Sequence, residues 1–309
     1  MTVSVRDLRL DVRSDVEEFA LVRHLALPFV LWTPDAVVHH LTHTHPDTRA
    51  RSLVAEEDGE VIGTAQVGLV HESPVPGQAY LNIYVRPDRP RRGAGGLLAR
   101  AAEEYLTAEG ATRLLAWVLD APGNRAFAER RGYRAGRSAH FLRLDLAGGG
   151  LPPLQSPPPG VELRPAADYA DDPRPLFELD AETTTDEPGD VDTALADYEA
   201  WLTETWRHPL LDLALTTVAV VDGRPAAFTA AYTDGGGRYA TAMTGTARAH
   251  RGRGLAKLVK NASLHRARAA GCTEAFTGND TGNGPMLAVN KWFGYEVCAT
   301  EVRYVRELG

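Results

Sequence analysis

The sequence predicts a mixed α/β fold, of α+β-like character, arranged as two tandem domains. The length of 309 residues suits two domains of about 150 residues each. Three landmarks also recur in the same order and at nearly the same spacing: Asp58-Gly59 and Asp222-Gly223, Gly93 and Gly254, Gly132-Tyr133 and Gly294-Tyr295. An internal repeat of this kind indicates two copies of one folding unit.

A segment rich in proline and glycine separates the two copies. We therefore expect an N-terminal domain of residues 1–147, a linker of residues 148–160 and a C-terminal domain of residues 161–309. Proline and glycine at this density exclude a helix or a central strand in the linker. The run Pro157-Pro158-Pro159 predicts a semi-rigid connection.

Each half opens with a strand, continues through a longer helical or irregular region, and then forms a hairpin. The opening strands are expected at Val3–Leu10 and Val161–Arg164. The two Asp-Gly pairs predict the hairpins because this dipeptide is typical of two-residue turns. The hairpin strands are expected at Leu53–Glu56, Val61–Ala65, Val218–Val221 and Ala226–Thr229.

In each half a strand then leads directly into a glycine-rich turn and a helix. We expect these strands at Tyr80–Val85 and Tyr239–Thr244, and the helices at Ala94–Glu109 and Leu255–Ala270. Each helix is followed by a glycine, which is typical of a helix C-terminus. A strand, a short helix and a closing strand, at Phe141–Asp145 or Glu301–Arg306, are expected to complete each half.

The glycine-rich turns predict a site for an anion. Glycine after a strand lets the backbone approach a ligand closely, and the following helix adds about half a positive charge at its N-terminus. A pyrophosphate group fits such a site. Neither turn has the GxxxxGK[ST] pattern of a Walker loop or the spacing of a dinucleotide-binding fingerprint.

The pattern that remains, R/Q-x-x-G-x-G/A after a strand, resembles motif A of the GNAT N-acetyltransferase superfamily. Arg251, Gly254 and Ala256 fill its defining positions, and Val85-Arg86-Pro87 matches its lead-in in the first half. The resemblance implies a mixed, mostly antiparallel sheet flanked by helices in each domain. It also implies that acetyl-CoA is the cosubstrate.

The same resemblance implies which residues bind acetyl-CoA. In the C-terminal domain they are Met243, Thr244, Gly245, Thr246, Arg251, Gly252, Arg253, Gly254, Leu255, Ala256, Asn283 and Asn290. In the N-terminal domain weaker contacts are implied for Val85, Arg91, Arg92, Gly93, Ala94, Gly95, Gly96 and Asn124.

The sequence also departs from the family's pattern. Pro90 stands where an arginine or glutamine should precede Gly93, so we expect the N-terminal domain to be degenerate and the C-terminal domain to be active. The tyrosine that many members use as the acid for the departing thiolate is Ala128 in the first half and Asn290 in the second. The strand Tyr239–Thr244 lacks the glutamate that relatives often use as a base.

The resemblance implies an N-acetyltransferase, an acyltransferase that acts on amino groups. The amine of a small molecule or peptide would attack the thioester directly, while backbone N–H groups of Met243–Thr246, centred on Thr244, polarise the acetyl carbonyl. Asp186 and Glu187 are candidates for recognising a cationic acceptor, and a solvated acidic loop is the alternative interpretation of the same residues.

Two other functions stay open. A non-catalytic acyl-CoA-binding sensor would explain the absence of both customary catalytic side chains. A mycothiol-synthase-like enzyme is the other, because the tandem arrangement and the length are distantly similar to that group.

Composition excludes several classes of protein. The net charge of −8 argues against nucleic-acid binding. No stretch approaches the ~20 apolar residues of a membrane span, and no signal peptide is evident, so we expect a cytoplasmic protein without a membrane partner. We expect a monomer or homodimer. The histidines between His39 and His45 have no cysteine nearby, and no metal site is expected.

Overall fold

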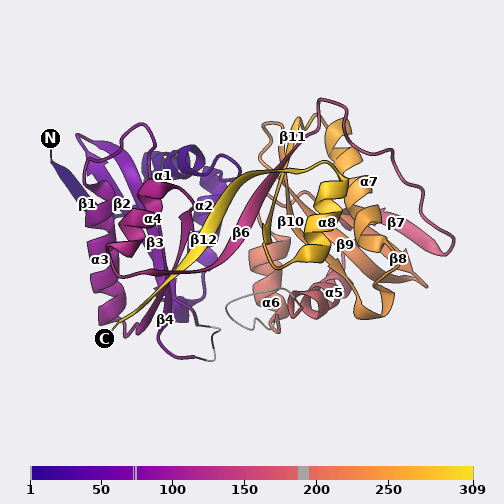
Figure 1. Ribbon diagram of the computed structural model, residues 1–309. Coiled ribbons are helices and arrows are strands. Elements are labelled where there is room, and N and C mark those ends of the chain that lie inside the picture. The colour runs from indigo at the N-terminus through magenta and orange to yellow at the C-terminus, as the bar shows by residue number, and fades with distance from the viewer. Residues whose placement is uncertain (1, 72, 74, 187–194, 309) are drawn as a thin grey trace. The chain divides into compact units, whose positions relative to one another are not determined.

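The computed structural model describes residues 2–71, 73, 75–186 and 195–308. The chain forms two compact units (Figure 1). Unit 1 comprises Met1–Ala139 and Ala299–Gly309, and unit 2 comprises His140–Cys298. None of the helices in the described ranges is long and apolar enough to cross a membrane.

Unit 1 contains a sheet with the strand order β1-β2-β3-β4-β5-β12. All of its neighbouring strands are antiparallel except β4 and β5. Its elements are β1 (Val3–Asp7), α1 (Arg13–Ala26), α2 (Pro34–His43), the 3-10 turn η1 (Pro46–Thr48), β2 (Arg51–Glu57), β3 (Glu60–Leu69), β4 (Gln78–Val85), α3 (Ala94–Ala108), β5 (Arg113–Leu119), α4 (Pro122–Glu129) and the start of β6 (Arg134–Asp145).

Unit 2 repeats this arrangement with the strand order β6-β11-β10-β9-β8-β7. β10 pairs parallel with β11, as β4 does with β5 in unit 1. Its elements are β7 (Val161–Pro165), η2 (Ala166–Tyr169), α5 (Arg174–Thr184), α6 (Tyr198–Trp201), η3 (Leu202–Trp206), β8 (Thr217–Val221), β9 (Arg224–Thr233), β10 (Arg238–Thr246), η4 (Arg248–His250), α7 (Leu255–Ala269), β11 (Glu274–Asp280), α8 (Gly284–Trp292) and the start of β12 (Glu296–Glu307). The predicted fold class is confirmed.

Local sequence chemistry explains the hairpins and the helix ends. Asp58 and Gly59 have φ values of 53° and 86°, and Asp222 and Gly223 have values of 50° and 76°. Two successive left-handed residues suit the twist of a tight hairpin. The glycines after α3 and α7 are also left-handed, as expected of residues that end a helix.

The closing strands pair differently from the expectation that each completes its own half. β12 begins in unit 2, but its residues Glu301–Glu307 pair antiparallel with β5 in unit 1. β6 begins in unit 1, and its later residues lie beside β11 in unit 2. The predicted boundaries at residues 147 and 161 therefore do not coincide with the two units. Both segments are alternating strands, and such a pattern does not specify which sheet edge the strand joins.

We call β6 and β12 the exchanged strands, because each begins in one unit and pairs in the other. Their side chains are buried in the core of the unit in which they pair. Tyr304 of β12 is 1% exposed and packs with Leu98 and Leu114 in unit 1. Leu144 of β6 is 4% exposed and packs with Leu264 and Phe293 in unit 2. Each sheet is thus completed by a strand that is distant in sequence.

The linker forms no helix or strand and is attached to α7. The side chain of Asn261 accepts a hydrogen bond from the backbone N–H of Gln155 at 2.7 Å. His265 of the same helix hydrogen-bonds the carbonyl of Pro152 at 2.8 Å. Leu151 is buried in the core of unit 2. The helix that follows the second glycine-rich turn is therefore held on its outer side by the linker.

The parallel strands of each unit separate after a few pairs. β10 and β11 are paired from Arg238 to Thr241, and a bulge in the pairing of β10 with β9 lies between Thr241 and Met243. Beyond the bulge, β10 keeps only β9 as a partner. The separation opens a backbone edge in the middle of the sheet, directly before the glycine-rich turn.

Candidate active site

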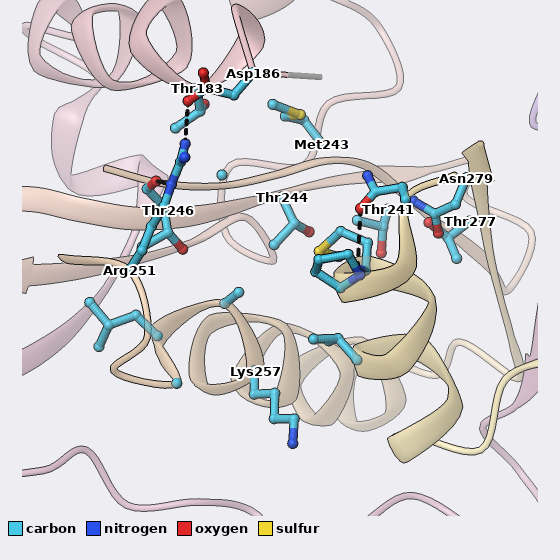
Figure 2. Close-up of a pocket in the computed structure, with 18 of the residues that line it drawn as sticks. Thr183, Asp186, Thr241, Met243, Thr244, Thr246, Arg251, Lys257, Thr277 and Asn279 are labelled. Atoms are coloured by element: carbon cyan, nitrogen blue, oxygen red, sulfur yellow. Dashed lines mark hydrogen bonds and ion pairs between the residues drawn. The ribbon is translucent and has the colours of Figure 1, made fainter. Parts of the chain in front are cut away.

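A pocket of about 530 Å³ lies in unit 2 at the point where β10 and β11 separate. Its walls come from β10, β11, the glycine-rich turn, the N-terminal ends of α7 and α8, and the segment after α5 (Figure 2). The predicted residues that line it are Asp186, Met243, Thr244, Gly245, Thr246, Arg251, Gly252, Gly254, Leu255, Ala256 and Asn283. One pocket thus collects residues that are distant in sequence.

Three predicted residues of this domain are placed elsewhere or are not described. Arg253 is exposed beside the turn, where its guanidinium contacts Nδ1 of His250 at 2.8 Å. Asn290 is 0% exposed and lies behind the pocket wall. Glu187 lies outside the described residues.

The glycine-rich turn of unit 2 is open to a ligand. Gly252 and Gly254 have φ values of 74° and 78°, which favour glycine, and a Cβ at either would meet no atom within 4 Å. α7 starts directly after Gly254 and has no acidic residue and no side-chain cap in its first turn. Its first N–H groups therefore have no partner within the helix and can bind an anion.

The edge of β10 presents backbone donors on the side that β11 has left. Ala247 donates its N–H to Ala226 beside β9 at 2.9 Å. Because successive residues of a strand alternate in direction, the N–H groups of Thr246 and Thr244 face away from β9. The contact between Arg251 Nε and the carbonyl oxygen of Thr246, at 3.2 Å, agrees with this direction.

The side chain of Thr244 is held by its neighbour strand. Its Oγ1 lies 2.8 Å from Oγ1 of Thr229, which is itself buried and donates to the carbonyl of Met243 at 3.3 Å. This arrangement fixes the backbone beyond the bulge. Thr244 thus contributes a positioned N–H group, while its hydroxyl is engaged with β9.

Asp186 is ion-paired with two arginines. Its carboxylate accepts from Arg248 at 2.9 and 3.0 Å and from Arg251 at 2.5 Å. Hydrogen bonds first from Arg248 and then from Arg251 lower the pKa of Asp186 to about 2. A carboxylate of this acidity is a poor base for an ammonium group. The negative charge of Asp186 is also already balanced by Arg248 and Arg251.

The two asparagines predicted at α8, Asn283 and Asn290, have different roles. Asn283 is the N-cap of α8 and accepts from the backbone N–H of Met286 at 3.3 Å. Asn290 accepts from Nζ of Lys260 at 2.6 Å and donates to Oδ1 of Asn279 at 2.5 Å. Lys260 is completely buried, and this burial lowers its pKa to about 7.

The corresponding turn of unit 1 has a similar backbone conformation but lacks some of the hydrogen-bond donors of unit 2. Gly93 has a φ of 88° and Arg91 a φ of 60°, and Arg91 occupies the position of Gly252. A non-glycine residue in this region is strained. Pro90 has no N–H and no side-chain donor. Arg92 lies 3.4 Å from the carboxylate of Glu57.

The other residues that the family resemblance implies for unit 1 lie at the end of β4, at the start of α3 and in α4. Val85 ends β4 as Thr246 ends β10, and Ala94, Gly95 and Gly96 form the first turn of α3. Asn124 lies inside α4, where its Nδ2 donates to the carbonyl of Leu119 at 3.3 Å. It is therefore not the N-cap, in contrast to Asn283.

The sequence interpretation missed several residues of the pocket and its wall. Thr183, Thr277, Asn279 and Lys257 line the pocket, and Lys260 lies behind it. The sequence does contain a signal for Lys260. It follows Val259 and precedes Ala262 on a helix whose apolar residues are buried. A lysine among the apolar positions of a helix is unusual, since an unpaired buried charge is costly.

Comparison with known proteins gives a family match over most of the chain. The model of the acetyltransferase (GNAT) family matches residues 19–133 and 175–295. A mycothiol acetyltransferase of Kineococcus radiotolerans is 31% identical over 262 residues, which cover 84% of this chain and 82% of that protein. A mycothiol acetyltransferase of Nocardia farcinica is 30% identical and covers 82% of each chain.

Solved structures share the same fold at lower identity. A tandem GNAT protein from the clavulanic acid biosynthesis pathway has a TM-score of 0.73 and 23% identity, with 100% of this chain and 99% of that chain covered. A GCN5-related N-acetyltransferase from Sphaerobacter thermophilus has a TM-score of 0.72 and 19% identity, with 99% and 95% covered. The tandem arrangement is thus found in solved structures.

Proposed function

The chain belongs to the GNAT acetyltransferase family, and from this premise we propose that unit 2 transfers the acetyl group of acetyl-CoA to an amine by direct attack on the thioester. The observation that carries the proposal is the continuity of one pocket. It joins an open anion-binding turn to a strand edge with two outward N–H groups. The acceptor we propose is the amine of a small molecule or peptide.

The residues of the pocket fit acetyl-CoA. The turn at Gly252 and Gly254, with the start of α7, would hold the pyrophosphate, because its backbone N–H groups are unpaired and its surface is open. Arg251 adds a positive charge beside it. The N–H group of Thr244 would donate a hydrogen bond to the acetyl carbonyl oxygen. When bound, acetyl-CoA supplies an activated acetyl thioester at this edge.

The acceptor has to arrive as a neutral amine. An alkyl amine has a pKa near ~10.4, so a proton has to leave it before attack. Asp186 is too acidic for this step, which favours transfer through water. We retain Asp186 and Glu187 as the proposed acceptor-side residues. Of these, Asp186 would have to exchange a contact with Arg248 or Arg251 to bind a cationic acceptor.

The acceptor of the mycothiol acetyltransferases is a specific candidate. The identity of 30–31% over most of the chain favours it. The strand β10 from Arg238 to Thr246 contains no carboxylate, so any such reaction would proceed without a base on this strand.

An amine panel tests the proposed activity. The protein should release free CoA thiol when it is incubated with acetyl-CoA and amines that include amino acids, aminoglycosides, peptide N-termini and the acceptor of mycothiol acetyltransferase. Thiol release with one amine class would identify the acceptor. Acetyl-CoA binding without release across the whole panel would instead favour the non-catalytic sensor.

A matched pair of variants tests which unit binds acetyl-CoA. Arg251→Ala with Gly254→Trp should abolish binding measured by calorimetry, while Arg92→Ala with Gly93→Trp should leave it nearly unchanged. The comparison is balanced because Gly254 and Gly93 have similar φ values, 78° and 88°, and both face open space. Loss of binding in the unit 1 variant alone would place the active site in the other unit.

A further inference from the structure

A chain of three polar side chains leads from the buried side of α7 to the pocket of unit 2. Nζ of Lys260 donates to Oδ1 of Asn290 at 2.6 Å, and Nδ2 of Asn290 donates to Oδ1 of Asn279 at 2.5 Å. Lys260 and Asn290 are both 0% exposed. Asn279 lines the pocket, where Figure 2 shows it beside Thr277 and Thr241.

The lysine fixes the direction of every donor in this chain. The amine of Lys260 donates to Asn290, so Asn290 turns Oδ1 toward Lys260 and Nδ2 toward Asn279. Asn279 then accepts through Oδ1, which leaves its Nδ2 as the donating end of the amide. The pocket wall therefore receives an amide N–H donor whose orientation is set from inside the protein.

Asn279 occupies a particular position on β11. Thr277 is the last residue of β11 that is paired with β10, and Asn279 follows it by two residues on the same face. It therefore stands where the strands separate, across the gap from the edge of β10. A thioester whose carbonyl oxygen accepts from Thr244 would lie in this gap, with Asn279 on its β11 side.

We propose that the amide of Asn279 donates a hydrogen bond to the sulfur of CoA as the thioester breaks, and that Lys260 and Asn290 position this amide. The inference rests on the acetyl transfer proposed above. It gives a function to Asn290, which stands where many relatives carry a tyrosine acid. In unit 2 the donor would have moved from α8 to β11.

The step balances without a proton from Asn279. The amine nitrogen forms a bond to the acetyl carbon, and the carbon–sulfur bond breaks with its electron pair on sulfur. The amine loses one proton to water, and the thiolate takes up one proton from water after it leaves. Asn279 keeps both amide protons and stabilises the negative charge on sulfur by its hydrogen bond.

Packing alone does not explain a lysine at this position. Among the described residues no carboxylate lies within ion-pair distance of Nζ of Lys260, and the ring of Tyr295 lies 4.9 Å from it. Leucine or methionine would fill the space without desolvating an amine. An amine donor at the far end of a hydrogen-bonded chain polarises the chain and strengthens its last donor.

The pKa of the CoA thiol in the binary complex tests the proposal without an acceptor. Free CoA is bound to the full chain, and the thiolate is titrated by its ultraviolet absorbance. Asn279→Ala should raise the pKa of the bound thiol by about one unit, because a donor to the thiolate is lost. Lys260→Met should raise it by a smaller amount, and CoA affinity should change by less than about threefold in both.

The exposed Lys291→Met, one residue from Asn290, is the matched control and should leave the thiol pKa unchanged. An unchanged thiol pKa in folded, CoA-binding Asn279→Ala would overturn this inference and leave the proposed function standing. Wild-type protein that binds no CoA would overturn both. A loss of stability in Lys260→Met with no shift of the thiol pKa in either variant would show that the chain only holds α8 against α7.

Discussion

Single charged residues set the electrostatics of the pocket in unit 2. Arg251 was predicted from the motif, but its ion pair with Asp186 was not, because the two are 65 positions apart in the chain. Asp186, which was predicted to recognise a cationic acceptor, is ion-paired with two arginines of the protein. Lys260 was not predicted at all. Ion pairs of this kind cannot be predicted from local sequence, because they form between segments that are distant in the chain and meet only in the folded protein.

The ion pair of Asp186 predicts an effect on cosubstrate binding. Asp186→Asn should tighten acetyl-CoA binding about two- to fivefold at low ionic strength, because Arg251 and Arg248 lose a competing anion. Calorimetry at two salt concentrations measures it, and the gain should shrink at the higher one. Glu178→Gln, an exposed change on α5, is the control. Weaker binding would show instead that Asp186 holds Arg251 in its binding geometry.

Lys260 predicts a pH-dependent stability. Burial lowers its pKa to about 7, whereas a lysine in an unfolded chain titrates near ~10.4. Between these values the unfolded state binds more protons, so this group makes the folded state more stable as pH rises. Tyr295 beside it stays neutral in this range because burial raises its pKa.

Urea unfolding at pH 7, 8 and 9 measures this effect. The free energy of unfolding of the wild type, relative to Lys260→Met, should rise by up to about 1.4 kcal/mol per pH unit. Lys291→Met should follow the wild type at every pH. Parallel curves for the wild type and Lys260→Met would mean that Lys260 keeps an ordinary pKa.

At the level of elements, the strand, glycine-rich turn and helix were predicted closely in both units. Ala94–Ala108 and Leu255–Ala269 begin at the predicted residues and end one residue earlier. These elements follow from local chemistry, since left-handed glycines and apolar periodicity act over a few residues. The partners of β6 and β12 were predicted wrongly, because strand pairing depends on distant segments.

The strand exchange predicts that a substitution near the C-terminus weakens the N-terminal unit. Tyr304→Ala should destabilise unit 1 by about 3–5 kcal/mol, because it removes a buried aromatic ring from that core. Leu144→Ala should destabilise unit 2 by about 2–5 kcal/mol. Hydrogen exchange followed peptide by peptide separates the two effects. Faster exchange in β10 and β11 for Tyr304→Ala, with unit 1 unchanged, would contradict the exchanged pairing.

At the level of the whole molecule, the two copies have diverged in chemistry while keeping one backbone plan. Unit 1 retains left-handed residues at positions 91 and 93, as unit 2 does at 252 and 254. Unit 1 has Pro90 and a strained Arg91 where unit 2 has Arg251 and Gly252. The tandem form therefore preserves a fold twice and, in our proposal, a catalytic site once.

The exchange of β6 and β12 also predicts that the two halves of the sequence do not fold independently. Residues 1–147 and 161–309 expressed separately should each be aggregated or partly unfolded, since each lacks the strand that completes its sheet. Expressed together they should form a complex that elutes at the size of the full chain. Residues 1–139 joined to residues 299–309 by a flexible linker should fold alone. Two halves that each fold as monomers would show that the exchange is not required.

Local sequence signals were enough to predict the repeat, the mixed α/β class, the hairpins, the glycine-rich turns and the difference between their two copies. Each of these depends on residues that are close in the chain, where backbone preferences and glycine positions act directly. The folded structure was needed to show which strands β6 and β12 pair with, that Asp186 pairs with Arg251, and that Lys260 is linked to Asn279 through Asn290. These depend on contacts between distant segments, and their geometry is fixed only when the sheets and helices pack.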